Sequence, residues 1–418
     1  MSTIEICGGK KLHGEVDIQG SKNAVLPILA ATLLNGDESI IHNCPDLADV
    51  RTAFSIIEML GGKAQYYDNT VVVNTANINK CNIPNDLMGS MRSSVLFIGA
   101  LLSRTGSAVV TRPGGCAIGV RPVDLHIKAF RELGVNVEES CGYMYCDVEK
   151  IKPATINLPF PSVGATENIM LLTALSDGET VITNAACEPE IVDLQNFLNA
   201  MGAKISGAGS EIIRILGVEK LNKVEYNIIS DRIFASTVSC AAACCGGDVF
   251  LRNAKPEQMR LVLALLKDAG CEIGIERQGV RIKCSERLRG LGKIITAPYP
   301  GFPTDAQAMC MSACCTAEGT TVFVENIFES RYKHVAELIK MGADIIVDGR
   351  LAVVTGRNYI QGASVKACDL RGGAALVVAG LSAIGDTSIS GVEHIDRGYE
   401  HIEETFSSLG ANIKRKQS

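Results

Sequence analysis

The amino-acid sequence predicts an α/β protein built from six copies of one structural unit, three in each of two domains. A short strand that opens with glycine recurs six times, at intervals of roughly 70 residues. An apolar stretch rich in small residues precedes each of these strands, and an amphipathic segment that ends in glycine follows it. A repeat of fixed period indicates a fold assembled from copies of one unit.

The elements of the repeat follow one another in a fixed order. The glycine-opened strands span residues 36–43, 106–111, 178–184, 247–253, 319–326 and 385–390. A helix is expected before each strand, as in the apolar runs 25–34 and 374–383. Glycine just beyond a periodic run is the usual helix stop, so the second helices are expected to end at Gly61, Gly134, Gly202, Gly270, Gly342 and Gly410. Alternating segments, as in 343–347 and 351–355, then predict a β-hairpin.

The two ends of the chain complement each other. The sixth copy stops about one strand after Gly410, and residues 4–18 are similar to residues 351–365, the end of an earlier copy. Residues 1–20 are therefore expected to complete the sixth unit. The predicted domains are residues 21–229 and residues 1–20 with 230–418. A linear repeat array is the alternative, but the matching ends favour two closed domains with a cleft between them.

Composition and charge narrow the function classes. The 418 residues carry a net charge of -6, which gives no support to a nucleic-acid partner. Residues 1–11 lack the apolar core of a signal peptide, and no apolar run would span a bilayer without polar interruption. We therefore expect a cytoplasmic protein without a membrane partner; the sequence makes no prediction of oligomeric state. Neither the 16 cysteines nor the six histidines form ligand pairs, so no metal is expected.

Cys116 lies in the most distinctive loop of the chain, residues 112–126. Glycines on both sides of Cys116 let backbone N–H groups approach a ligand closely, and Arg112 and Arg121 flank them. A thiol beside arginines ionises more readily than an isolated one. The alternative is a small apolar cysteine packed under a tight turn. The glycines and arginines favour a reactive thiol in an anion-binding loop.

Polar and charged residues recur where the first helix of each unit is expected to begin. They are Ser21-Lys22-Asn23, Ser90 with Arg92, Ser162-Val163-Gly164, Ser230-Asp231-Arg232, Thr304-Asp305, and Asp369 with Arg371. Serine, threonine and aspartate are good N-caps, so a purely structural role is one interpretation. It leaves the cations unexplained, because a positive charge beside a helix N-terminus is unfavourable unless an anion also binds there. If these helix ends converge, the ligand is strongly anionic.

Two further arginines, Arg331 and Arg397, occupy matching positions after the fifth and sixth glycine-opened strands. Taken singly, each would be an ordinary solvated surface charge. Their matching positions in the repeat favour a place for both in the predicted cleft.

The chain resembles the UDP-N-acetylglucosamine 1-carboxyvinyltransferase family over essentially its whole length. The most specific matching segments are residues 20–24, 114–126, 161–166, 302–305, 369–371 and 394–400. The resemblance implies an inside-out α/β barrel of two lobes, each made of three βαβαββ units. It also implies transfer of the enolpyruvyl group of phosphoenolpyruvate to the 3′-hydroxyl of UDP-N-acetylglucosamine, with release of phosphate and without a cofactor.

The resemblance further implies a role for each matching residue. Cys116 would donate the proton, Asp305 would take the proton of the sugar hydroxyl, and Lys22 and Arg397 would complete the catalytic set. Phosphoenolpyruvate would contact Lys22, Asn23, Arg121, Arg371 and Arg397. The nucleotide sugar would contact Arg92, Arg121, Pro122, Val123, Asp124, Leu125, Ser162, Val163, Gly164, Asp305 and Ile327. Arg331 and Asp369 would complete the substrate-binding residues. Alkylation of Cys116 by fosfomycin is implied as well.

One departure and two alternatives accompany this resemblance. Some family members carry a lysine before the Ser-Val-Gly turn, where this chain has Phe160-Pro161, so one diphosphate contact is in doubt. A 5-enolpyruvylshikimate-3-phosphate synthase-like transferase shares the implied fold but lacks the Gly-Gly-Cys loop. A non-catalytic nucleotide-sugar sensor would not need Cys116, Asp305 and Lys22 together.

Overall fold

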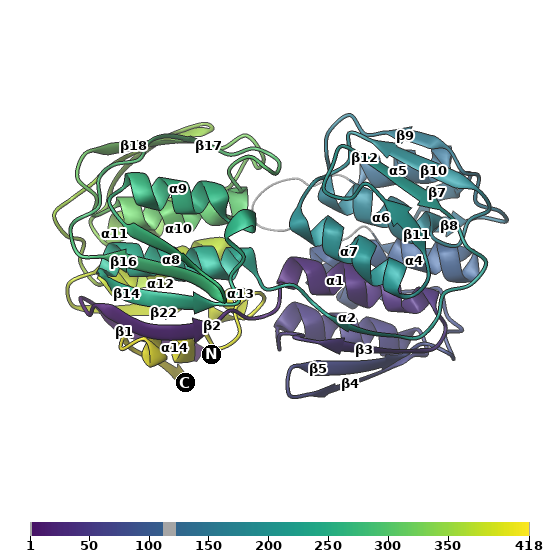
Figure 1. Cartoon of the computed structure of the whole chain (residues 1–418), viewed down its shortest axis with the longest axis horizontal. Coiled ribbons are helices and arrows are strands. Elements are labelled where there is room, and N and C mark those ends of the chain that lie inside the picture. Colours follow the sequence, from purple (N-terminus) through teal and green to yellow (C-terminus); the bar gives the residue numbers. More distant parts are fainter. Residues whose placement is uncertain (1, 112–122, 418) are drawn as a thin grey trace. The chain divides into compact units, whose positions relative to one another are not determined.

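The computed structural model describes residues 2–111 and 123–417, which divide into two compact units (Figure 1). The N-terminal unit comprises residues 20–111 and 123–229, and the C-terminal unit comprises residues 2–19 and 230–417. The chain thus leaves the C-terminal unit after Gln19 and returns to it at Ser230.

The N-terminal unit surrounds three apolar helices with three sheets in its described residues. The helices are α1 (Lys22–Ala31), α4 (Leu96–Thr105) and α6 (Val163–Thr173). In strand order, the first sheet is β13 (Val224–Asn227), β3 (Glu38–His42), β5 (Thr70–Asn74) and β4 (Lys63–Tyr67). The second is β6 (Ser107–Thr111), β8 (Tyr143–Asp147) and β7 (Asn136–Ser140). The third is β11 (Lys204–Ser206), β12 (Ile212–Leu216), β10 (Glu179–Thr183) and β9 (Thr155–Asn157). The second helices are α2 (Ala48–Met59), α5 (Asp124–Glu132) and α7 (Pro189–Ala200).

The C-terminal unit has the same plan. Its apolar helices are α8 (Arg232–Cys245), α10 (Thr304–Cys314) and α12 (Leu370–Ser382). In strand order, its first sheet is β15 (Glu272–Glu276), β16 (Gly279–Cys284), β14 (Gly247–Arg252) and β2 (Leu12–Asp17). The second is β17 (Gly292–Ile295), β18 (Thr320–Val324), β20 (Leu351–Thr355) and β19 (Asp344–Asp348). The third is β21 (Ser364–Lys366), β22 (Asp386–Ser390), β1 (Ser2–Cys7) and β23 (Asn412–Gln417). The second helices are α9 (Arg260–Asp268), α11 (Val335–Lys340) and α14 (Ile402–Ser408), and a short helix α13 spans Val392–Ile395.

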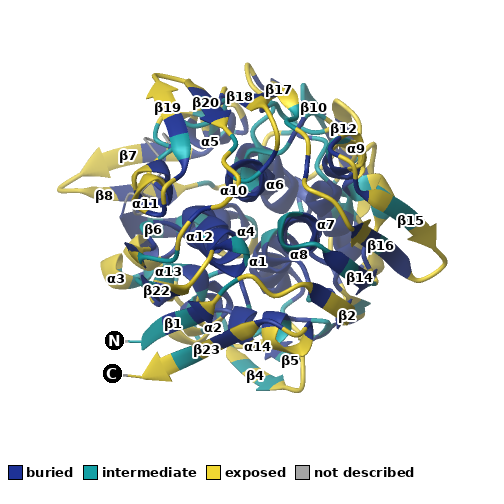
Figure 2. Ribbon diagram, turned by 90° about the vertical axis from the view of Figure 1, so that its left-hand side faces the viewer, coloured by how far each residue is buried: buried dark blue, intermediate teal, exposed yellow. Residues whose placement is uncertain are grey.

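The central helices α8, α10 and α12 are buried along nearly their whole length, whereas the sheets around them are buried on one face (Figure 2). A helix that is apolar on all sides belongs in a core, and strands with alternating burial form its cover. The alternation is clear in β22, where Thr387 and Ile389 are buried and their neighbours are not. The structure therefore has helices inside and sheets outside, and the predicted inside-out α/β fold is confirmed.

The predicted helix stops are also confirmed. All six glycines that follow the second helices have positive φ, from +88° at Gly342 to +111° at Gly270. This left-handed conformation is readily adopted only by glycine, and it ends each helix so that the chain can turn into the hairpin.

The N-terminal strands lie among strands of the C-terminal half of the chain. β1 lies antiparallel between β22 and β23, with Ile4 opposite both Ile389 and Arg415. β2 pairs in parallel with β14. The chain passes between the two units at residues 19–20 and again at residues 229–230, and backbone hydrogen bonds join these two crossovers. Ser21 N donates to Ile229 O over 2.8 Å, and Asp231 N donates to Gln19 O over 2.8 Å.

The second repeat begins differently from the others. Ser90 does not start the first helix of this repeat; it is the last residue of an additional short helix, α3 (Asn85–Ser90), and its hydroxyl donates to Leu87 O. A 3-10 turn then begins at Arg92 and leads into α4. Within residues 2–111 and 123–417, no helix combines the length and the apolar character needed to cross a membrane.

Candidate active site

Asp305, in the first turn of α10, receives hydrogen bonds from two buried arginines. Arg331 Nη2 donates to Oδ1 over 2.7 Å, and Arg371 Nη2 donates to Oδ2 over 3.1 Å. Each arginine side chain is at most 4 % exposed, whereas that of Asp305 remains 26 % exposed. Charge-assisted contacts of this kind hold a carboxylate in one orientation. Asp305 thus presents a fixed carboxylate that a ligand can still reach.

Arg371 is held on its other side by a chain of hydroxyl groups. Its Nη1 donates to the Tyr399 hydroxyl over 3.2 Å, and that hydroxyl lies 2.9 Å from Thr237 Oγ1. Thr237 donates in turn to Ile233 O, so Tyr399 donates to Thr237. Burial by itself would lower the pKa of Arg371, but the Asp305 carboxylate and Tyr399 raise it above its ordinary value. The guanidinium is therefore charged although it is buried.

Asp369 caps α12 next to this pair. Its Oδ1 accepts from Arg371 N over 3.1 Å and from Gly372 N over 3.0 Å, as an N-cap should. Its Oδ2 is buried and has no hydrogen-bond partner in the described part of the chain; the same holds for both ring nitrogens of His334. Burial lowers the pKa of His334 to about 4, against the raising effect of Asp369. His334 is therefore neutral at physiological pH.

Ile327 is placed close to the start of α10 through a carboxylate. Glu325, at the end of β18, accepts from the Ile327 and Phe328 N–H groups through Oε1, the first over 2.8 Å. Its Oε2 accepts from Thr304 Oγ1 over 3.0 Å, and Thr304 is the first residue of α10. Glu325 thereby joins the Ile327 loop to the helix end that carries Asp305.

Lys22 is the first residue of α1 and is buried with a partner. Its Nζ lies 2.8 Å from Asp49 Oδ2, with 9 % and 5 % of the two side chains exposed. Asp49 lies in the first turn of α2, so its carboxylate also stabilises that helix end. Gly20, two residues before Lys22, lies so close to Asn43 O that an added β-carbon would be 1.7 Å from that oxygen. Asn23 follows Lys22 and is half-buried.

Arg92, His126 and the start of α6 form a second group in the N-terminal unit. His126 Nδ1 accepts from Asn168 Nδ2 over 2.8 Å, which leaves the ring proton on Nε2. Burial, with a smaller effect of Arg92, lowers the pKa of His126 to about 4. A β-carbon on Gly164 would lie 3.2 Å from His126 Cε1, so this ring lies against the first turn of α6. Ser162 caps that helix by accepting from Ala165 N.

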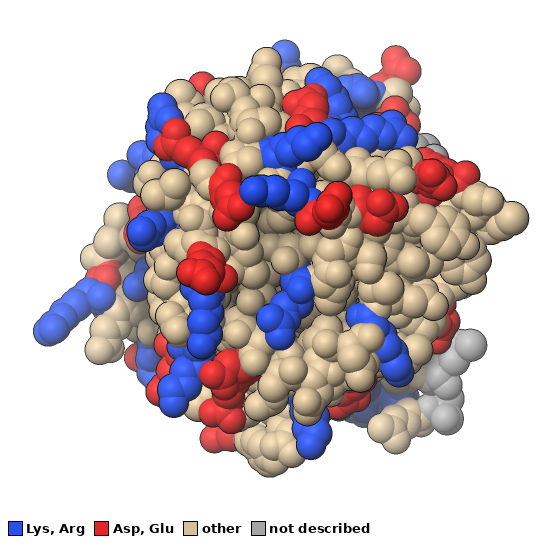
Figure 3. Space-filling view, turned by 90° about the vertical axis from the view of Figure 1, so that its right-hand side faces the viewer, with Lys and Arg blue, Asp and Glu red and all other residues tan. Residues whose placement is uncertain are grey.

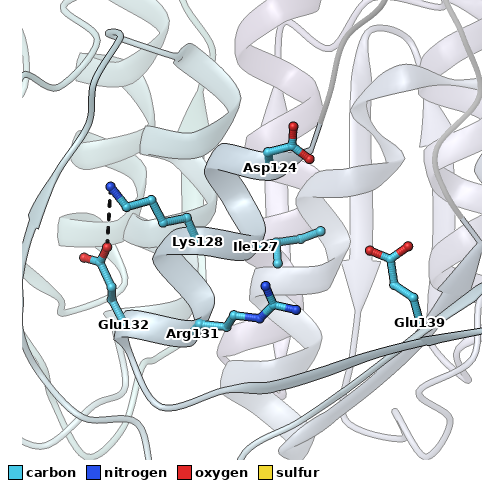
Figure 4. A pocket seen from close by; sticks show the side chains of 6 residues that line it. All are labelled: Asp124, Ile127, Lys128, Arg131, Glu132 and Glu139. Carbon is cyan, nitrogen blue, oxygen red and sulfur yellow. Dashed lines mark ion pairs between the residues drawn. The ribbon is translucent and has the colours of Figure 1, made fainter.

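Asp124 is the first residue of α5, Val123 precedes it at the N-cap position, and Leu125 follows half-buried. A shallow hollow of about 430 Å³ runs along this helix, lined by Asp124, Ile127, Lys128, Arg131, Glu132 and Glu139 (Figure 4). Lys128 and Glu132 are 3.8 Å apart within it. Charges of both signs line this hollow, and they also mix on the molecular face in Figure 3. Cys116, Arg121 and Pro122 lie outside the described residues.

One group in the described chain has the spacing of metal ligands, namely His401, Glu403 and Glu404. Arg415 already donates to both oxygens of Glu403, over 2.7 and 3.0 Å. This engagement argues against the group as a metal centre.

The structure groups the sequence-predicted residues in two sets. Asp305, Arg331, Asp369 and Arg371 lie together in the C-terminal unit, and Arg397 lies in the turn that also contains Tyr399. In the N-terminal unit, Arg92 lies near the α6 turn through His126, while Lys22 pairs with Asp49. Sequence reasoning missed Asp49, His126, His334 and Tyr399. A signal existed for Asp49, because Glu190 and Glu403 occupy the same second position of their own second helices.

Comparisons with known proteins agree with this architecture. Residues 6–406 match the EPSP synthase (3-phosphoshikimate 1-carboxyvinyltransferase) family. The chain is 50 % identical to UDP-N-acetylglucosamine 1-carboxyvinyltransferase 2 of Caldanaerobacter subterraneus subsp. tengcongensis, over 99 % of this chain and 100 % of that protein. It is 46 % identical to the UDP-N-acetylglucosamine 1-carboxyvinyltransferase of Geobacter metallireducens, over 99 % of both chains. Among solved structures, the enolpyruvyl transferase NikO from Streptomyces tendae has a TM-score of 0.88 at 25 % identity, over 100 % of this chain and 99 % of that chain.

Proposed function

The chain belongs to the UDP-N-acetylglucosamine 1-carboxyvinyltransferases, within the wider EPSP synthase family, and we propose the following reaction and residue roles for it. It transfers the enolpyruvyl group of phosphoenolpyruvate to the 3′-hydroxyl of UDP-N-acetylglucosamine and releases phosphate. This is the step that commits the nucleotide sugar to peptidoglycan synthesis.

The observation that carries the residue assignment is the Asp305 carboxylate held between Arg331 and Arg371. A carboxylate fixed in this way can accept the proton of the sugar hydroxyl as the hydroxyl oxygen attacks C2 of phosphoenolpyruvate. In the same addition C3 gains a proton, for which we assign Cys116 as the donor. The tetrahedral adduct then returns a proton from C3 to the Cys116 thiolate, and the C2–O bond to phosphate breaks, which restores the double bond and releases phosphate.

The arginines and Lys22 are assigned to the charges of phosphoenolpyruvate. Arg371 is buried and positively charged, and Arg397 lies in the same unit, in the turn beside Tyr399. Preorganised cations stabilise the charge that develops on a departing phosphate and need no rearrangement during the reaction. The Asp49 carboxylate holds Lys22 at the start of α1, which is the setting that the family resemblance assigns to phosphoenolpyruvate.

The diphosphate of the nucleotide sugar is assigned to the start of α6. The N–H groups of a first helical turn are unpaired within the helix and favour anions, and residues 162–164 form that turn. Arg92 lies near enough to lower the pKa of His126, and the His126 ring lies against the same turn. Phe160 and Pro161 stand where some family members have a lysine. In this chain the N–H groups of the first turn of α6, together with Arg92, would therefore supply the diphosphate contacts.

A phosphate-release assay tests the function. Phosphoenolpyruvate should release phosphate with UDP-N-acetylglucosamine and not with shikimate 3-phosphate. Replacement of the base in Asp305→Asn should lower kcat at least about 100-fold, the usual contribution of a positioned general base. The matched control is Glu179→Gln, which also converts a carboxylate to an amide but at an exposed ion pair with Arg214. Turnover with shikimate 3-phosphate alone would refute the assignment, as would full activity of Asp305→Asn.

A further inference from the structure

The turn that carries Arg397 lacks regular secondary structure of its own. Residues 396–400 follow the short helix α13, and their internal hydrogen bonds run back to that helix, as from Gly398 N to Ile395 O over 3.0 Å. A guanidinium on such a turn is placed only as well as the turn itself is held. The groups that hold this turn therefore contribute to where Arg397 points.

Gln19 holds the turn from one side, although nearly 380 residues separate the two in sequence. Its Oε1 accepts from Glu400 N over 3.0 Å, and its Nε2 donates to Gly398 O over 3.3 Å. A donor and an acceptor as partners fix which end of the amide is nitrogen. The side chain thus pairs with the turn backbone on both sides of Tyr399, as a neighbouring strand would.

The backbone of Gln19 is itself anchored. Its carbonyl accepts from Asp231 N over 2.8 Å, and Asp231 caps α8 through bonds from Ile233 N and Phe234 N. Gln19 is also the residue after which the chain leaves the C-terminal unit. Gln19 therefore connects the Arg397 turn to a buried helix end and to a chain crossover.

Arg415, on β23, holds the same turn from its other end. It donates to both oxygens of Asp396, over 2.9 and 2.7 Å, and to both oxygens of Glu403 in α14. Bidentate pairing of arginine with carboxylate restricts orientation as well as distance. Asp396 directly precedes Arg397, so this contact fixes the backbone at the point where the Arg397 side chain begins.

We propose that Gln19 and Arg415 are positioning residues for Arg397, and that Gln19 ties the placement of this arginine to the chain crossover. The proposal rests on the proposed binding of phosphoenolpyruvate by Arg397. Charge-assisted contacts to a small anion depend strongly on geometry. Loss of the clamp should therefore weaken phosphoenolpyruvate binding, although neither residue needs to touch the substrate.

The main test is Gln19→Met, which keeps the length of the side chain and removes both amide groups. The KM for phosphoenolpyruvate should rise about tenfold, because small displacements of a binding group have large kinetic effects. The Kd for UDP-N-acetylglucosamine and the thermal midpoint should stay close to those of the wild type. Gln278→Met, in the exposed turn between β15 and β16, makes the same chemical change and should alter none of these values.

A double-mutant cycle separates positioning from general damage. In an Arg397→Ala background, Gln19→Met should add no further rise in the KM for phosphoenolpyruvate, because the group it positions is gone. An equal rise in both backgrounds, or none in either, overturns the proposal. If Arg397→Ala alone leaves this KM unchanged, the proposed role of Arg397 fails instead.

Two further variants keep the test decisive if Gln19→Met folds poorly. Gln19→Asn retains an amide but is one methylene too short to reach both Gly398 O and Glu400 N. Arg415→Lys retains the charge but cannot pair with Asp396 through two nitrogens. Both should raise the KM for phosphoenolpyruvate in the wild-type background and not in Arg397→Ala. A wild-type KM in both variants overturns the proposal.

Discussion

The ammonium group of Lys22 lies 2.8 Å from the carboxylate of Asp49, and both side chains are almost completely buried. The pair joins the first residue of α1 to the first turn of α2. A lysine at a helix N-terminus is electrostatically unfavourable by itself. Asp49 offsets this repulsion and so keeps a cation at a position where the reaction is expected to need one.

Asp49→Asn should therefore destabilise the protein as well as disturb Lys22. Removal of one carboxylate from a buried ion pair takes away part of the compensation of the other charge, and we expect a loss of roughly 3 kcal/mol in the free energy of unfolding. Urea denaturation measures this loss. Glu179→Gln breaks the exposed pair with Arg214, whose side chains are 51 % and 56 % exposed, and should change stability by less than about 1 kcal/mol. Equal losses in both variants would contradict the argument.

Tyr399→Phe tests the chain of hydroxyl groups behind Arg371. The substitution keeps the buried ring and removes the acceptor for Arg371 Nη1 and the donor to Thr237. A buried charged donor left without its acceptor should reduce the free energy of unfolding by about 1–3 kcal/mol. The control is Tyr67→Phe, because Tyr67 is 61 % exposed. A Tyr399→Phe protein as stable as the control would mean that Arg371 does not depend on this hydroxyl.

The buried histidines predict a loss of stability in mild acid. Burial lowers the pKa of His126 and of His334 to about 4, whereas the unfolded chain titrates near 6.5. Between these values the unfolded chain binds more protons, so stability falls as pH falls, on the order of 3 kcal/mol for each histidine. Asp193 acts in the opposite direction: burial raises its pKa to about 6, so its contribution to stability falls as pH rises from about 4 to 6.

His334→Leu should flatten this pH profile. Leucine has no titrating group, so the variant removes the contribution of His334 to the pH dependence. The slope of unfolding free energy against pH should decrease by about one proton between pH 4 and 6.5. Urea denaturation at several pH values measures the slope, and His13→Leu, at an exposed position of β2, should leave it unaltered. An unchanged slope in His334→Leu would show that this ring is already protonated or exposed in the folded protein.

The repeat predicts the fold far better than it predicts the site. Glycine stops and glycine-opened strands are local features, and the six positive-φ glycines lie where the spacing placed them. Contacts such as Asp305 with Arg371, 66 residues apart, or Gln19 with Glu400 depend on how the units close. A linear pattern does not contain that information. The additional helix α3 escaped notice because residues 85–90 interrupt the repeat and do not follow its period.

The cysteines in the described residues range from buried to exposed, and their thiols should differ in reactivity accordingly. Burial raises the pKa of Cys314 to about 12 and raises that of Cys315 as well, so these thiols should resist alkylation. Cys7 and Cys141 are exposed in the described residues, and a general alkylating reagent should modify both. Selectivity for Cys116 therefore requires a reagent that docks through its anionic group before it reacts.

Fosfomycin, a small phosphonate that carries an epoxide, should alkylate Cys116 alone. The phosphonate should take the place of the phosphate of phosphoenolpyruvate, and UDP-N-acetylglucosamine should accelerate the reaction by aligning the epoxide with sulfur. Intact mass and peptide mapping should show one adduct, whereas iodoacetamide should also label Cys7 and Cys141. Cys116→Ser should lose labelling, and Cys116→Asp should lose labelling yet retain turnover, because a carboxylic acid can still deliver the proton. Adducts spread over several cysteines, or an active enzyme without an adduct, would show that Cys116 is not the proton donor at an anion site.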